Sequence, residues 1–230
     1  MRHLHFLVEG QTEEVVVQST IEPYFSSLDI WISLSLLKTK RPAGGPAFKG
    51  GITNWQKISR EVRLLLRDSS IDVLTTILDY YAFPPGAPGM TDRPQGSPYD
   101  RVRHVERALA KEIGDQRFLP HLVLHEIETW VLADCVRLGE VMGDAGGAAE
   151  LSNMVKQESN PELVDDGPAT TPSKRILNAY PNYRKTIDGP LVIADAGLTS
   201  IRQSCPHADE WLKNIEAKIE PQDRVSDGEQ

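Results

Sequence analysis

Acidic residues follow three of the strands that the sequence predicts. Glu9 comes after a β-favouring run and Asp79 after a hydrophobic run, while Glu126 and Glu128 follow a later hydrophobic run. Carboxylates that a fold brings together repel one another, so a cluster of them is unfavourable unless a cation is bound. Oxygen ligands without cysteine suit Mg²⁺ or Mn²⁺, and two such ions about 4 Å apart support in-line attack on a phosphodiester. These residues therefore predict a divalent-cation site for phosphate chemistry.

Strand and helix patterns alternate through the part of the chain that carries these residues. In chain order they predict strand 4–8, helix 12–27, strand 30–37, helix 54–68, strand 71–78, helix 99–113 and strand 119–124. Thr12 is expected to cap the first helix. Such alternation predicts an α/β fold with a mostly parallel sheet flanked by helices. Ligands of such sheets bind beyond the carboxyl ends of the strands, where the acidic residues are expected to lie.

Composition suggests one α/β domain with an appendage. The chain of 230 residues is predicted to form an α/β domain over residues 1–142 and a mainly helical C-terminal extension, packed on it, over residues 143–220. Residues 143–167 are small and polar, and a closing helix is expected at residues 208–217 around Trp211. Residues 221–230 form a polar tail.

Two groups of basic residues are candidates for contact with phosphate. They are Lys40, Arg41 and Lys49 in a glycine-rich loop, and Lys174 and Arg175 at a predicted helix start. The formal net charge of −8 excludes general attraction to nucleic acid, so any such binding must be local or use bound cations. At the helix start, Lys174 could clamp phosphate, act as a base or stabilise charge in the transition state.

Cysteine content and hydropathy indicate the compartment. Cys135 and Cys205 are the two cysteines and have no partner pattern, so neither a disulfide framework nor a cysteine-based zinc site is expected. Charged residues near the N-terminus argue against a secretory signal, and no apolar stretch reaches the ~20 residues that span a bilayer. The sequence therefore predicts a cytoplasmic protein without a membrane partner.

Several motifs resemble a known family. The segment Val8–Glu13 resembles the first motif of Toprim domains, hydrophobic-Glu-Gly-x-x-(Asp/Glu), and Asp79 stands where their Asp-x-Asp motif begins. The chain as a whole resembles an uncharacterised bacterial Toprim-like family. The recurring pieces of that family appear here as Val8-Glu9-Gly10, Leu78-Asp79-Tyr80-Tyr81, His125-Glu126-Ile127-Glu128-Thr129-Trp130, Pro172-Ser173-Lys174-Arg175 and Cys205-Pro206-His207.

The resemblance implies a Toprim fold and a role for particular residues. Glu9 matches the Toprim glutamate that acts as metal ligand or general acid/base, Glu13 the second acidic position, and Asp79 the first aspartate of Asp-x-Asp. Tyr81 stands where the second aspartate would be. Either one metal site is lost, or Glu126 or Glu128 replaces the missing ligand.

The family also implies a partner and a function. The genes of its relatives lie beside genes for ABC-type AAA ATPases, as in overcoming-lysogenization-defect nucleases and two-gene abortive-infection systems. The expected function is therefore a Mg²⁺- or Mn²⁺-dependent Toprim-type nuclease acting on DNA or RNA, the effector of a bacterial defence pair with an ATPase partner. The alternatives are a catalytically silent Toprim-like module that regulates an ATPase or nucleic acid, and a phosphotransferase or primase-like activity at the same site.

Overall fold

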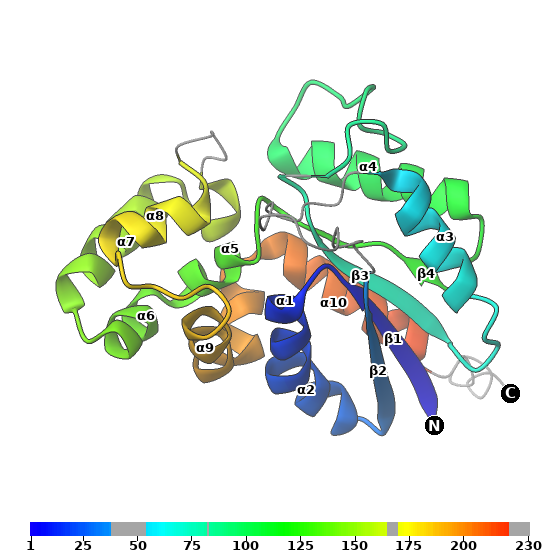
Figure 1. The fold of residues 1–230 in the computed structure, drawn as a ribbon, viewed down its shortest axis with the longest axis horizontal. Coiled ribbons are helices and arrows are strands. Elements are labelled where there is room, and N and C mark those ends of the chain that lie inside the picture. Colours follow the sequence, from blue (N-terminus) through cyan, green and yellow to red (C-terminus); the bar gives the residue numbers. More distant parts are fainter. Residues whose placement is uncertain (38–53, 82, 165–169, 221–230) are drawn as a thin grey trace, which may run out of the picture.

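The computed structural model describes residues 1–37, 54–81, 83–164 and 170–220. Within them, a parallel sheet lies between helices that cover both of its faces (Figure 1). Its strands are β1 Arg2–Val8, β2 Ile30–Leu36, β3 Val73–Asp79, β4 Phe118–Leu119 and β5 Leu122–Val123. The strand order is β2-β1-β3-β4, with β5 paired to β3, and these pairings are parallel. The prediction of an α/β fold with a parallel sheet is confirmed.

Helices form most of the remaining described structure (Figure 1). In chain order they are α1 Gln11–Val16, a π-helical turn Val17–Ile21, α2 Glu22–Ser26, α3 Trp55–Leu65, α4 Pro98–Ile113, α5 Glu128–Val131, a 3-10 turn Leu132–Asp134, α6 Cys135–Met142, α7 Ala145–Gln157, a 3-10 turn Pro161–Leu163, α8 Pro172–Ala179, α9 Asp188–Ser204 and α10 Pro206–Ile219. Among the described residues, none of these helices combines the length and apolarity that a membrane span requires.

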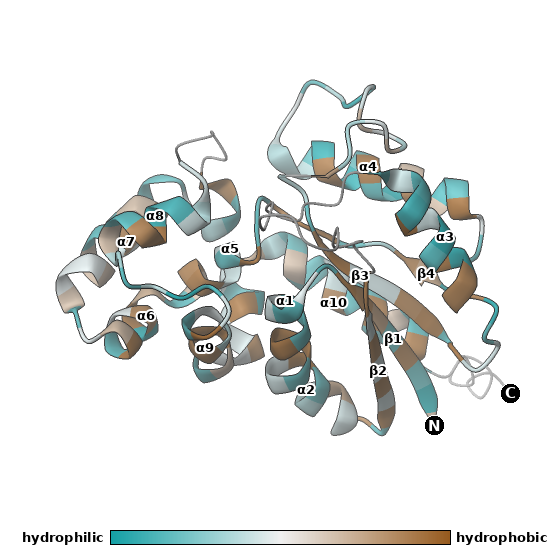
Figure 2. Cartoon of the chain, viewed as in Figure 1, coloured by the Kyte–Doolittle hydropathy of each residue, from teal (hydrophilic) through white to brown (hydrophobic). Residues whose placement is uncertain are grey.

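The two faces of the sheet bury alternate residues of the strands, because successive side chains of a strand point in opposite directions. On one face, Leu4 and Phe6 of β1 join a hydrophobic core with α1, α2, α9 and α10. On the other face, Leu7 of β1 and Leu74 of β3 join a second core with α3 and α4. In Figure 2 the strands carry mainly hydrophobic colours, whereas the helices carry hydrophobic and hydrophilic colours, as amphipathic helices on a sheet do.

The helical C-terminal region shares the first of these cores. Val192 of α9 and Leu212 of α10 are fully buried there with residues of β1 and β3. The indole Nε1 of Trp211 in α10 donates a hydrogen bond to Oγ1 of Thr75 in β3 at 2.8 Å. The last helix therefore covers one face of the sheet. The division of the chain at residue 142 stays a prediction.

The first helix differs from its predicted form. It begins at Gln11 after an N-cap at Gly10, so Thr12 lies inside the helix and is not its cap. A π-helical turn separates α1 from α2, and Pro23 lies in the first turn of α2. Proline has no backbone N–H to bond to the preceding turn, which accounts for the break in regular α-helix.

One strand also differs from the prediction, and the small, polar segment after residue 143 forms a helix. The strand expected at 119–124 is split into β4 and β5, since Pro120 has no N–H for the ladder and the N–H of His121 bonds to Oγ1 of Thr76 at 2.9 Å. The small, polar segment after residue 143 contains α7. Asp144 caps this helix, and Gly147 packs where a Cβ atom would lie 2.7 Å from the ring of Tyr180. The small residues there allow close helix packing, which composition alone does not distinguish from a turn.

Candidate functional site

β1 and β3 are neighbours in the sheet, and their carboxyl ends lie side by side. The connections that leave these two strands run in opposite directions across the sheet. From β1 the chain passes through α1 and α2 to β2 on one side. On the other side of β1, β3 leads to α4 on the opposite face of the sheet. Parallel sheets bind ligands at such points, where neighbouring connections diverge. Glu9 follows β1 and Asp79 ends β3, so both residues lie there.

Hydrogen bonds fix these two residues relative to the segment that follows β5. The backbone N–H of Asp79 donates to Oε2 of Glu9 at 3.4 Å, and Oδ1 of Asp79 accepts from the backbone N–H of Ile127 at 3.1 Å. His125 has a φ of 70°, a left-handed conformation that side chains other than glycine rarely adopt. Its Nε2 lies 2.9 Å from the carbonyl oxygen of Glu162. This turn brings the chain after β5 to Asp79.

Two further carboxylates and a lysine complete the site. Glu128, the first residue of α5, is 0 % exposed, and Nζ of Lys185 lies 2.8 Å from its Oε2. Glu13 is buried in the first turn of α1. Lys185, which lies between α8 and α9, also acts electrostatically on Glu9 and Asp79. We call Glu9, Glu13, Asp79, Glu128 and Lys185 the carboxylate cluster.

Burial and mutual repulsion raise the pKa values of these carboxyl groups. Burial, reinforced by the charge of Glu13, raises the pKa of Glu9 to about 7. Burial also raises the pKa of Glu128 to about 7 and that of Asp79 well above its ordinary value, although Lys185 opposes both shifts. Burial alone would lower the pKa of Lys185, but the charges of Glu128 and Asp79 outweigh it and raise that pKa. The lysine therefore balances only part of the negative charge that the cluster can carry.

The residues predicted at the start of α8 lie beside a different carboxylate. Oε2 of Glu126 accepts a hydrogen bond from the backbone N–H of Ser173 at 3.0 Å. Lys174 is exposed in the same helical turn, and Nε of Arg175 donates to the carbonyl oxygen of Thr170 at 3.3 Å. The N-terminus of α8, which was expected to hold phosphate, thus receives the carboxylate of Glu126.

Other predicted positions contribute less to the described site. Lys40, Arg41 and Lys49 lie outside the described residues. Tyr81, which stands at the second acidic position of the motif, is 43 % exposed, and its backbone N–H bonds to the carbonyl oxygen of His125 at 3.0 Å. The carboxylate of Glu128, whose charge raises the pKa of Asp79, is the one available in its place.

The carboxylate cluster is more open than a preformed metal site. Among the described residues, Glu106, His121 and His207 are the group whose potential ligand atoms all lie within 4.8 Å of one another. No three members of the carboxylate cluster, all of them described, meet that spacing. Magnesium commonly keeps several of its waters, so its carboxylate ligands need not all touch the ion. The spacing of the cluster is therefore compatible with a hydrated ion.

Sequence reasoning missed two residues of this region, Lys185 and Tyr183. The hydroxyl of Tyr183 is buried and has no hydrogen-bond partner within the described ranges. Burial, followed by the charge of Glu128, raises its pKa. Both residues belong to an ordinary polar segment after α8, and no spacing or motif relates that segment to Glu128. Their position results from tertiary folding, which no local pattern signals.

A family model described as Domain of unknown function (DUF4276) matches residues 8–216. The chain belongs to the DUF4276 family. No curated protein and no solved structure matches it. The matched range of the DUF4276 model includes the whole carboxylate cluster and the group formed by Glu106, His121 and His207. The family description assigns no activity, so functional inference for this DUF4276 protein depends on its geometry.

In this DUF4276 protein we expect Glu9→Gln to flatten the dependence of stability on pH. The folded pKa of Glu9, about 7, lies above the ordinary value of 4.5, so between these values the folded state keeps a proton that the unfolded state has lost. This contribution to the free energy of unfolding is fully present below the unfolded pKa and is lost as pH rises through the folded pKa. When the pH rises from about 5 to 8, the free energy of unfolding of the wild type should fall by on the order of 2 kcal/mol more than that of the variant.

Urea unfolding of both proteins at the two pH values measures this difference. The comparison measures the titration of Glu9 together with its electrostatic effect on Asp79, whose pKa the charge of Glu9 raises. Glu14→Gln, in helix α1 and outside the carboxylate cluster, should keep the wild-type dependence. Identical pH dependence of the wild type and Glu9→Gln would contradict the raised pKa.

Proposed function

We propose that this protein is a Mg²⁺- or Mn²⁺-dependent nuclease that cleaves phosphodiester bonds in DNA or RNA at the carboxylate cluster. The observation that carries the proposal is the convergence of Glu9, Asp79 and Glu128 from three separate segments at the ends of β1 and β3. Buried carboxylates gathered in this way are favourable when a cation balances them. The resemblance of the segments around Glu9 and Asp79 to the two Toprim motifs supports the same reaction class.

The donor set of the cluster fits a hydrated divalent cation. Oε1 of Glu128 is buried without a hydrogen-bond partner among the described residues, and Lys185 balances part of the charge. Glu9 and Asp79, with Glu13 or Glu128, would hold the ion through hard oxygen ligands. When bound, such an ion supplies the positive charge that a phosphodiester needs for approach and for activation of water.

The side chains of the cluster provide the remaining chemistry in this proposal. Water is the nucleophile, and a carboxylate of the cluster that is not bound to the ion accepts its proton. The ammonium group of Lys185, held by Glu128, offsets the charge of the incoming phosphate. Lys174, exposed at the start of α8, is a candidate for contact with the phosphate backbone.

The proposal includes a partner. The resemblance to overcoming-lysogenization-defect nucleases supports a role as the effector of a two-gene bacterial defence pair, restrained by an ABC-type AAA ATPase. Residues 83–97, which form neither helix nor strand, are a candidate contact for such a partner.

Calorimetric titration with Mg²⁺ and Mn²⁺ tests the site without knowledge of the substrate. We expect Glu9→Gln to lower the affinity for Mn²⁺ by about tenfold or more, since even residues that only orient metal ligands contribute that much. The glutamine oxygen can still accept from the backbone N–H of Asp79, so the fold should remain. Glu14→Gln serves as the matched control and should bind as the wild type does. Equal binding by Glu9→Gln and the wild type would contradict the assignment.

A second candidate function is a catalytically silent module that binds and regulates an ATPase or nucleic acid. Lys185 favours it, because its ammonium group beside Glu128 and Asp79 stands where a cation would be needed. In that case the wild type does not bind Mn²⁺, and Lys185→Met gains binding in the same titration. For a nuclease, by contrast, Lys185→Met binds Mn²⁺ at least as tightly as the wild type but cleaves more slowly.

A further inference from the structure

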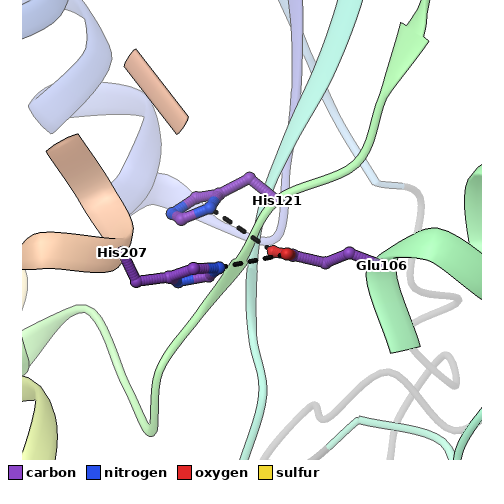
Figure 3. A group of neighbouring side chains, drawn as sticks. All are labelled: Glu106, His121 and His207. Atoms are coloured by element: carbon purple, nitrogen blue, oxygen red, sulfur yellow. Dashed lines mark hydrogen bonds and ion pairs between the residues drawn. The ribbon is translucent and has the colours of Figure 1, made fainter. Parts of the chain in front are cut away.

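A second group of chemically active side chains lies where α4, the β4–β5 connection and α10 meet (Figure 3). Glu106 comes from α4, His121 from between β4 and β5, and His207 from the first turn of α10. Nε2 of His207 lies 3.0 Å from Oε2 of Glu106, and Nδ1 of His121 lies 3.5 Å from Oε1 of Glu106. We call these three residues the histidine–glutamate group. Side chains from three separate elements thus point toward one another.

Neighbouring residues hold two members of the group in place. Oε1 of Glu106 accepts a hydrogen bond from the backbone N–H of Leu122 at 2.8 Å, which leaves Oε2 facing His207. The ring of His121 stacks on the ring of Trp211, with centroids 4.2 Å apart and planes 7° apart. Such contacts preset ligand orientation in metal sites.

Glu162 holds the third member through the start of α10. Its carboxylate accepts hydrogen bonds from the backbone N–H groups of His207 and Ala208 at 2.9 and 3.0 Å. Its carbonyl oxygen contacts Nε2 of His125. The first turn of α10, and with it the position of His207, is therefore fixed by buried contacts.

The hydrogen bonds of His121 are incomplete. Its side chain is 1 % exposed, and within the described ranges neither ring nitrogen has a hydrogen-bond partner. Its 3.5 Å contact with Glu106 is longer than an ordinary hydrogen bond. Buried polar groups in proteins are nearly always satisfied, so an unsatisfied imidazole nitrogen aimed at a carboxylate indicates a missing partner.

We propose that Glu106, His121 and His207 bind a first-row transition-metal ion, with Zn²⁺ as the favoured one. Two imidazoles and one carboxylate form a ligand set that zinc and its neighbours use in proteins. Ligand atoms at zinc-bond distance in a tetrahedral site lie about 3.3 Å from one another. The contacts of 3.0 and 3.5 Å involve Oε2 and Oε1 of Glu106, respectively. One ligand atom of each residue lies within 4.8 Å of the others, so small side-chain shifts would bring the three ligands onto one ion.

The site opens to a pocket. All three ligands line a cavity of about 630 Å³, whose wall also carries Arg107 and Lys218. Three protein ligands leave the fourth position of a tetrahedral ion open, as in catalytic zinc sites. The pocket gives this position access to water or to a small ligand. A water molecule from the pocket therefore completes the coordination of the ion.

Titration of the full-length protein with Zn²⁺, and with Co²⁺ as a spectroscopic probe, tests the proposal. With excess Mg²⁺ present to occupy the carboxylate cluster, the wild type should bind one equivalent and give the strong visible absorption of Co²⁺ with low coordination number. Glu106→Gln keeps an acceptor for the N–H of Leu122 but loses the anionic ligand, so its affinity should fall at least about tenfold. His207→Gln should show a similar loss. His104→Gln, in the same helix α4 and outside the group, is the matched control and should bind normally.

A second measurement uses the unaltered protein and does not depend on how variants fold. One equivalent of Zn²⁺ should shift the imidazole NMR resonances of His121 and His207 and leave those of His3 and His5 in place. Absence of binding to the folded wild type, unchanged affinity in Glu106→Gln, or shifts confined to other histidines would each overturn the proposal. The group would then be a buried ion pair. Glu9→Gln should leave Zn²⁺ affinity unchanged, which separates this site from the carboxylate cluster.

Discussion

Asp79→Asn is expected to reduce metal-dependent cleavage of DNA or RNA by about 10²- to 10³-fold, the size of effect that loss of one preorganised electrostatic group produces. Asp79 is partly buried at the end of β3, and burial raises its pKa well above the ordinary value in the absence of a cation. An asparagine keeps an oxygen that can accept from the backbone N–H of Ile127, the hydrogen bond that Asp79 makes at 3.1 Å. The variant therefore removes a metal ligand while the connection to the segment after β5 persists.

Cleavage of labelled single- and double-stranded DNA and RNA in Mn²⁺, with and without a co-expressed ATPase partner, measures this effect. Asp195→Asn is a suitable control because Asp195 lies exposed in α9 and is not a member of the cluster. Circular dichroism checks the fold of both variants. Full activity of a folded Asp79→Asn protein would exclude Asp79 as a ligand and remove the main support for a nuclease.

Trp211→Ala should lower the free energy of unfolding by about 3 to 5 kcal/mol, as large-to-small changes of buried aromatic residues do. The Trp211 side chain is 3 % exposed and stacks on His121, and its Nε1 donates to Thr75 of β3 at 2.8 Å. The substitution opens a cavity between α10 and the sheet and leaves the Thr75 hydroxyl without this donor. Equilibrium urea unfolding measures the change.

Trp31→Ala provides the comparison for this effect. Trp31 is 49 % exposed in β2 and contacts the ring of His3 at a centroid distance of 3.9 Å. Its loss should lower stability by about 1 kcal/mol or less. If the two tryptophan variants were equally stable, α10 would not be an integral part of the sheet's hydrophobic core.

The parts of the fold that sequence predicts are those with a local signal. β1 and β3 are short, mainly apolar runs that are buried almost throughout, and the acidic residues at their ends are adjacent to these runs in sequence. The meeting of Glu9 and Asp79 then follows from the parallel arrangement. Glu13 lies close by because a helix begins directly after Gly10.

The residues that sequence does not reveal are brought in by distant segments. Lys185 reaches Glu128 from a loop between helices, and His207 reaches Glu106 and His121 from the last helix. No periodicity relates these positions. Contacts between side chains of different layers depend on how α8, α9 and α10 pack on the sheet. The split between β4 and β5 places His121 in the second site, although Pro120 alone signals only that the strand is interrupted.

The left-handed backbone of His125 has a mechanical consequence. Glycine would adopt this conformation without strain, whereas another residue there raises the energy by on the order of 1 kcal/mol. Only a side chain, however, can supply the contact between Nε2 of His125 and the carbonyl oxygen of Glu162, the residue whose carboxylate holds the start of α10. The end of β5 and the first turn of α10 are thus tied to each other by a short, buried connection. A displacement at the carboxylate cluster would therefore be transmitted toward His207 as a joint movement of the two segments.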